Sequence, residues 1–136
     1  MNRSLLLAYQ VLTGLSDTLT GALLIIAPEL TLGLMRLHAP SEAYPYISCL
    51  GAFVLSVGLA CLYGAALMIR GGSPRKLEAV WLLTAITRAS VAIVVFAQVY
   101  AHALEAGWLT VAAFDAACVL IQAVGLRKGW LGNAAR

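Results

Sequence analysis

The chain has 136 residues, of which 62% are hydrophobic and only 11% are charged, and its formal net charge is +3. Together with a mean hydropathy of +0.90, this composition excludes a soluble globular domain, because too few polar side chains are present to cover a water-exposed surface. The sequence therefore predicts an integral membrane protein.

Four apolar segments, each about 19 to 25 residues long, match the roughly 20 residues that an α-helix needs to cross the hydrocarbon of a bilayer. They cover residues 5–27, 46–69, 77–101 and 108–126. Because their connections are short, neighbouring helices should run antiparallel. We expect an all-α fold, an integral membrane up-down-up-down four-transmembrane-helix bundle that forms one domain over residues 1–136. The first segment is longer than a signal peptide and has no clear cleavage site, so we expect it to be retained.

The longest connection, residues 28–45, lies between two prolines. Leu30, Leu34 and Leu37 recur in it at helical spacing, which predicts a short helix lying in the outer membrane interface. Such a segment can act as a passive connector or as a lid, and the sequence favours the connector.

Basic residues gather at the two termini and in the second connection. They are Arg3, Arg70, Arg75, Lys76, Arg127, Lys128 and Arg136. Only Arg36 lies on the other side. By the positive-inside rule, we expect both termini to be cytoplasmic (N-in/C-in), with the bacterial inner membrane as the location. The positive net charge is thus a topology signal and indicates no nucleic-acid partner.

The second segment is rich in small residues, which let helix backbones approach closely inside a bilayer. One series recurs every four residues and another every seven: Ala52, Ser56, Ala60 and Gly64, then Gly51, Gly58 and Ala65. Two small faces exceed what one neighbouring helix requires. Besides the lipid bilayer, we therefore expect a homo-oligomer or a partner membrane subunit.

Three charged residues, Asp17, Arg88 and Asp115, lie in the middle of the first, third and fourth segments. At a rise of about 1.5 Å per residue, the expected topology places all three within roughly 5 Å of one plane. An ionisable side chain at membrane depth is costly and marks a functional site unless it is paired. Because a guanidinium presents a planar fork of donors, Arg88 can bind both carboxylates at once.

The three groups carry one surplus negative charge if all are ionised, and we expect one Asp to hold a proton, or water or a cation to compensate. Asp17, Arg88 and Asp115 are the candidate catalytic residues. Four further residues share their helix faces and are candidate ligand-binding residues: Thr13, Thr84, Gln122 and Trp108.

Three functions fit this pattern. The sequence favours the first, a non-catalytic subunit or helper of a membrane assembly, whose buried charges organise the bundle. The alternative is an integral membrane acid/base enzyme acting on a lipophilic small molecule, for example by epoxide hydrolysis or isomerisation. The constellation, although not the chain, is similar to the Asp-Arg-Asp arrangement of the limonene epoxide hydrolase family, which is soluble and differently folded. The third function is proton-coupled transport.

Other chemistries have less support. His38 and His102 both fall near the outer interface and form no pair across the bundle, which argues against a haem. Too few ligands share one depth for a metal site, and no Gly-rich phosphate loop is present, so we expect no cofactor and no metal. Cys49, Cys61 and Cys118 lie within spans without a Cys-x-x-Cys motif, and we expect them to act as small apolar contact residues.

The chain resembles the DoxX-like group of small four-helix membrane proteins. The resemblance rests on Ala27-Pro28-Glu29-Leu30 with Gly33-Leu34, on Leu50-Gly51-Ala52 with Gly58-Leu59, and on Arg88 and Asp115 in the third and fourth helices. It implies a four-helix membrane fold, and some members are linked to quinone-coupled sulfur oxidation or to membrane redox complexes. Of the candidate site residues, the resemblance covers Arg88 and Asp115.

Overall fold

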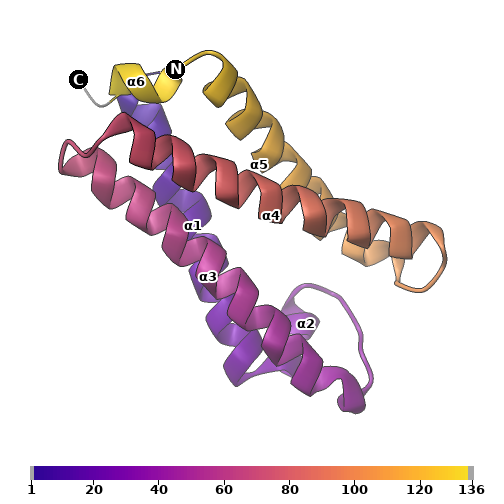
Figure 1. The fold of residues 1–136 in the computed structure, drawn as a ribbon. Helices are drawn as coiled ribbons and strands as arrows, with labels where there is room; N and C mark the ends of the chain where they lie inside the picture. The colour runs from indigo at the N-terminus through magenta and orange to yellow at the C-terminus, as the bar shows by residue number, and fades with distance from the viewer. Residues whose placement is uncertain (1, 135–136) are drawn as a thin grey trace.

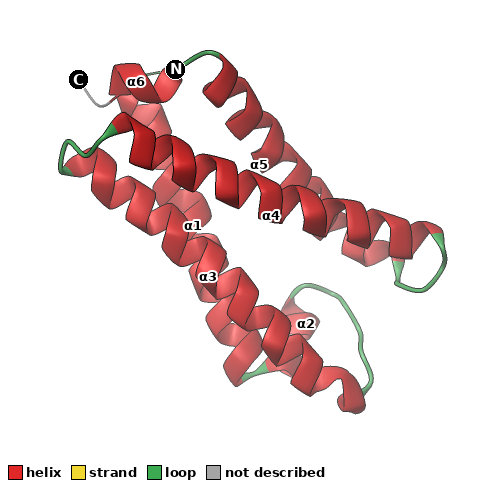
Figure 2. Cartoon of the chain, viewed as in Figure 1, coloured by secondary structure: helices red, strands yellow, loops and turns green. Residues whose placement is uncertain are grey.

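A computed structural model describes residues 2–134, which are almost entirely helical and contain no β-strand (Figure 2). The α-helices are α1 (Arg3–Ile26), α2 (Pro28–Leu34), α3 (Tyr44–Ile69), α4 (Pro74–Tyr100), α5 (Leu109–Arg127) and α6 (Trp130–Ala134). Short 3₁₀ turns, η1 (Ser41–Ala43) and η2 (Ala106–Trp108), precede α3 and α5. Four helices, α1, α3, α4 and α5, are long and apolar enough to cross a membrane. The prediction of an all-α integral membrane protein with four candidate spans is confirmed.

Local sequence signals explain where these helices begin and end. The side chain of Asn2 caps α1 by accepting a hydrogen bond from the backbone N–H of Ser4 at 3.3 Å. Between α3 and α4 the chain reverses through Gly71, whose φ of 68° suits a residue without a Cβ. Pro74 then opens α4, where its missing N–H costs no helical hydrogen bond.

The four long helices form two closely packed pairs. Figure 1 shows α1 lying along α3 and α4 lying along α5, with the pairs joined near the turn between α3 and α4 and diverging towards α2. In α3 the residues spaced by seven, Gly51, Gly58 and Ala65, are buried, whereas Ala52 and Ser56 of the other small series are exposed. The residues spaced by seven therefore explain the close approach of α1 to α3.

A cluster of apolar side chains closes the end of the molecule where the two termini lie (Figure 1). It consists of Leu6, Met68, Leu77, Trp81 and Leu131. Leu131 belongs to α6, a short helix that the hydropathy pattern does not predict because it is far shorter than a span. The chain reaches the cluster by turning at Gly129, where φ is 61°.

The connection after α1 contains a helix, as predicted, since α2 occupies Pro28–Leu34. Beyond α2, Leu37 is buried, and a methyl group built on Gly107 would lie only 2.9 Å from its Cδ2 atom. His38 Nδ1 lies 3.4 Å from Glu105 Oε2. The connection thus touches the loop between α4 and α5 and links the two helix pairs at the end where they diverge.

The close contact between α1 and α3 can be tested at Gly58. A Cβ at this position would collide with the backbone of Thr18 and would lie 2.9 Å from the carbonyl oxygen of Gly14. We expect Gly58→Ala to lower the free energy of unfolding by about 1–3 kcal/mol, as overpacking does elsewhere. Thermal unfolding in detergent measures the change. Gly33→Ala is the matched control because nothing lies within 4 Å of its added methyl group, and equal behaviour of the two variants would contradict the packing described.

Candidate functional site

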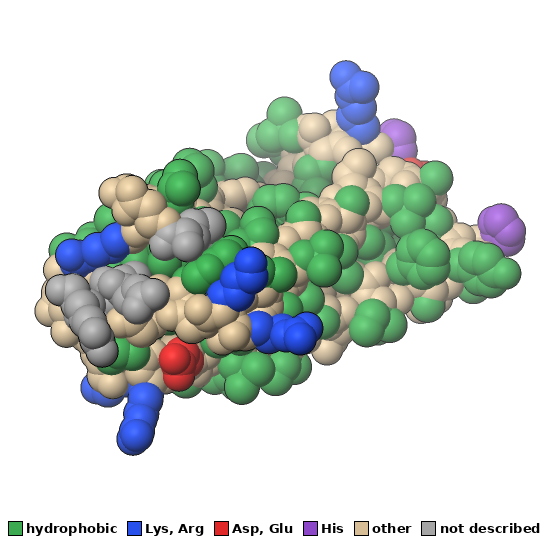
Figure 3. Space-filling model, turned by 90° about the horizontal axis from the view of Figure 1, so that it is seen from above, with side chains coloured by type: hydrophobic (Ala, Val, Ile, Leu, Met, Phe, Trp, Pro, Cys, Tyr) green, Lys and Arg blue, Asp and Glu red, His purple; other side chains and the backbone are tan. Residues whose placement is uncertain are grey.

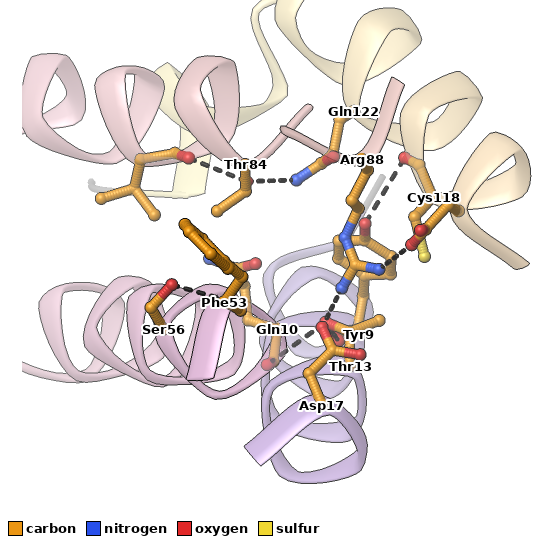
Figure 4. A network of polar contacts seen from close by, with 12 residues as sticks. Tyr9, Gln10, Thr13, Asp17, Phe53, Ser56, Thr84, Arg88, Cys118 and Gln122 are labelled. Atoms are coloured by element: carbon orange, nitrogen blue, oxygen red, sulfur yellow. Dashed lines mark hydrogen bonds and ion pairs between the residues drawn. The ribbon is translucent and has the colours of Figure 1, made fainter. Parts of the chain in front are cut away.

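The three intramembrane charges meet, as the sequence predicts. Arg88 of α4 donates through Nη1 to Oδ1 of Asp115 on α5 at 2.5 Å, and through Nη2 to Oδ2 of Asp17 on α1. Figure 4 shows the guanidinium placed between the helices that it joins. The exposed fractions are 3% for Arg88, 7% for Asp17 and 8% for Asp115. One guanidinium fork therefore ties both helix pairs together in the interior of the protein.

Two aromatic side chains lie close to this cluster. The guanidinium carbon of Arg88 lies 5.4 Å from the centre of the Phe114 ring, within the range of a cation–π interaction. Tyr9 of α1 donates its hydroxyl to the backbone carbonyl of Cys118 on α5 at 3.4 Å, a second link between the helix pairs. Sequence reasoning missed both residues, although Phe114 is adjacent to Asp115 and Tyr9 lies beside the predicted polar face of α1.

Between the charges and the apolar cluster lies a layer of buried polar side chains. Gln122 Nε2 donates to Thr84 Oγ1 at 2.7 Å, and the Thr84 hydroxyl donates to the carbonyl of Val80 at 2.8 Å (Figure 4). Thr13 donates to the carbonyl of Tyr9 at 2.7 Å. Gln10 is fully buried, and neither its amide nitrogen nor its oxygen has a hydrogen-bond partner within residues 2–134.

A cavity of about 310 Å³ lies on the other side of the charges, in the space between the diverging helix pairs. Asp17, Arg88 and Asp115 all line it. Its remaining polar lining consists of the hydroxyl side chains of Ser16, Thr20, Thr87 and Thr110 together with the indole of Trp108. The apolar lining residues are Leu24, Leu32, Met35, Leu50, Phe53, Val54, Val57, Val91, Val95, Val111 and Phe114. A volume of this size lies at the lower end of the range for small-molecule sites, about 300–1,000 Å³.

The candidate ligand-binding residues separate into two groups. Trp108 lines the cavity. Thr13, Thr84 and Gln122 are not among the residues that line it, and they belong instead to the buried polar layer. Their predicted role in ligand binding stays a prediction.

Each carboxyl group lines the cavity and has one oxygen that does not bind Arg88. Asp17 uses Oδ2 and Asp115 uses Oδ1 to bind Arg88, and their second oxygens make no hydrogen bond or ion pair with the residues that the structure describes. The enclosed side-chain atoms that lack a hydrogen-bond partner include Nε of Arg88 but neither of these two oxygens. Because both carboxyl groups border the cavity, a bound molecule can reach an acceptor or, where a carboxyl holds a proton, a donor.

Comparisons of the chain with protein-family models, with curated proteins and with solved structures found no match. The chain is a small integral membrane protein with four candidate spans and a buried Asp-Arg-Asp cluster at the floor of a cavity.

Replacing Arg88 tests the tie between the helix pairs. Arg88→Met leaves two buried carboxyl groups without their partner, and we expect a loss of about 3–5 kcal/mol in the free energy of unfolding. Arg88→Lys should lose less but remain destabilised, because one ammonium cannot reproduce the fork that reaches both helices. The loss is measured by thermal unfolding, with Arg70→Lys at the exposed end of α3 as the control. Wild-type stability of Arg88→Lys would show that the fork geometry is unimportant.

Proposed function

We propose that this protein binds a lipophilic small molecule in the cavity and performs acid/base chemistry on its polar end with Asp17, Arg88 and Asp115. The observation that supports the proposal is the cavity itself, which has apolar walls and reaches two buried carboxyl groups held by one guanidinium. A close-packed cluster of charges without adjoining space would have favoured a purely structural role.

The walls of the cavity indicate how such a molecule enters. Phe53 of α3 and Phe114 of α5 both line the cavity, yet their exposed fractions are 69% and 43%. In a bilayer these exposed apolar surfaces face lipid, because the spans that carry them are surrounded by hydrocarbon. A lipophilic molecule can therefore enter from the membrane between the helix pairs without crossing water.

Hydrolysis of an epoxide illustrates the chemistry that the cluster can perform. The ionised carboxyl takes a proton from water while the water oxygen forms a bond to an epoxide carbon. As the ring C–O bond breaks, the protonated carboxyl gives its proton to the opening oxygen, and the product is a diol. The two carboxyl groups have then exchanged roles, and a proton transfer between them restores the starting state. Arg88 holds both groups in position and stabilises the developing negative charge.

The proposal includes an orientation in the bacterial inner membrane. Figure 3 shows most of the visible Lys and Arg side chains gathered around one end of the molecule and the histidines at the other. This asymmetry supports an up-down-up-down arrangement with both termini in the cytoplasm. The cavity and α2 then lie in the outer half of the protein, and the apolar cluster closes the cytoplasmic end.

A second candidate function is a non-catalytic subunit whose charges organise the bundle. It is favoured by the position of Arg88, which ion-pairs with both helix pairs, and by the small residues Ala52 and Ser56, whose face of α3 is left exposed. Such a face suits a second copy or a partner helix. The resemblance to the DoxX-like group stays a prediction and would fit this role. Proton-coupled transport has less support, because the apolar cluster separates the charges from the end that holds the termini.

The catalytic proposal is tested with 1,2-epoxydecane in phosphatidylcholine nanodiscs. We expect the protein to form decane-1,2-diol above the rate of protein-free nanodiscs. Asp17→Asn and Asp115→Asn should each lower that rate by about 100- to 10,000-fold, the usual contribution of a general acid or base. Because Asn keeps the shape of Asp and removes the surplus charge, the Tm of both variants should not fall. Glu78→Gln, which changes a carboxylate remote from the cavity lining, is the control.

The same variants separate the two candidate functions. Absence of diol formation by the wild-type protein would overturn the proposed epoxide chemistry. A fall in the Tm or in the assembly of Asp115→Asn, with no change in any turnover, would favour the structural subunit.

A further inference from the structure

We infer that the cavity selects its ligands by charge, binding a lipophilic cation more tightly than a neutral molecule of the same length and rejecting the corresponding anion. This inference rests on the proposed function, because it concerns the same cavity, and it names the class of ligand that the site prefers. Three observations carry it: the net charge of the floor, the carboxyl oxygens that do not bind Arg88, and the nature of the walls.

The floor of the cavity carries one surplus negative charge when its groups are ionised. Arg88 contributes one positive charge, and Asp17 and Asp115 contribute two negative charges. No other residue that lines the cavity is charged. Three further titratable side chains face the cluster, Tyr9 on α1, Cys61 on α3 and Cys118 on α5, and all three are neutral in their ordinary protonated forms. Nothing nearby therefore compensates the surplus charge apart from a shared proton or a bound cation.

The charged floor of the cavity offers a ligand acceptors, whereas the donors of the lining are the neutral hydroxyls and the indole of Trp108. Both terminal nitrogens of Arg88 are directed at the carboxyl groups, and its Nε is enclosed. Asp17 and Asp115 both line the cavity, and each has one oxygen that does not bind Arg88. A primary ammonium carries three donors and can donate to more than one carboxyl oxygen, a hydroxyl can donate to only one, and a carboxylate donates to none.

The walls favour a cation over other polar groups. Phe53, Trp108 and Phe114 all line the cavity, and an aromatic face within about 6 Å attracts a cation. Because the surrounding walls are apolar, the attraction between an ammonium and the carboxyl oxygens is poorly screened, and so is the repulsion of an anion. A bound ammonium supplies the charge that otherwise has to come from the shared proton.

The test compares decylamine, decan-1-ol and decanoate, which have the same chain and differ in the charge of the head group near neutral pH. Binding to the protein in phosphatidylcholine nanodiscs is measured from the tryptophan fluorescence change, with Trp108→Phe identifying the part of the signal that arises in the cavity. Protein-free nanodiscs correct for partition into lipid. We expect decylamine to bind at least tenfold more tightly than decan-1-ol, and decanoate to show no saturable binding.

Asp115→Asn removes the surplus charge while it keeps the shape of the floor. In this variant the preference for decylamine over decan-1-ol should fall below about threefold, since neutralising one charge removes the electrostatic difference between the two ligands. Asp17→Asn should behave in the same way, so the inference remains testable if one variant fails to fold. Glu78→Gln should keep the wild-type preference.

The outcomes distinguish this inference from the proposed function. Equal affinity for decylamine and decan-1-ol, or an unchanged preference in both Asn variants, would overturn charge selection and leave the cavity as a binding site. Failure of all three compounds to bind would overturn the binding site itself, and with it the proposed function.

Discussion

The arrangement of the helices depends on the double ion pair of Arg88. The two helix pairs diverge towards α2, so side chains that reach from one pair to the other have to hold the structure at mid-depth. Arg88 does so by binding Asp17 and Asp115 through separate nitrogens. Charges in this environment are stable only when they are paired, and the pairing in turn selects which helix faces meet.

The same divergence that makes the ion pairs necessary also creates the cavity. Close packing is most extensive between α1 and α3 and between α4 and α5, and the apolar cluster adds to it near the termini. On the side of the charges that faces α2, valine and phenylalanine side chains line an open space instead of interlocking. A structural tie and the proposed reactive site are therefore not exclusive alternatives, because Arg88 forms the tie and the proposal assigns it to the reactive site as well.

Much of this could be predicted from the sequence because the controlling signals are local. Apolar runs long enough to span a bilayer predicted the four long helices. Three isolated charges at similar depth predicted that their side chains meet inside the protein. The cavity could not be predicted, because its existence depends on the angle between the helix pairs, which no residue pattern specifies. For the same reason Thr84 and Gln122, on the predicted faces, bind each other, while Phe53, outside those faces, lines the cavity.

The most direct test of the central claim is a structure of the protein in lipid nanodiscs with 10-bromodecylamine. We expect density for the amine between the second oxygens of Asp17 and Asp115, with the alkyl chain and its bromine lying between α3 and α5. A structure in which the two helix pairs lie against each other, with valine side chains filling the space between Arg88 and α2 and no bromine there, would contradict the account.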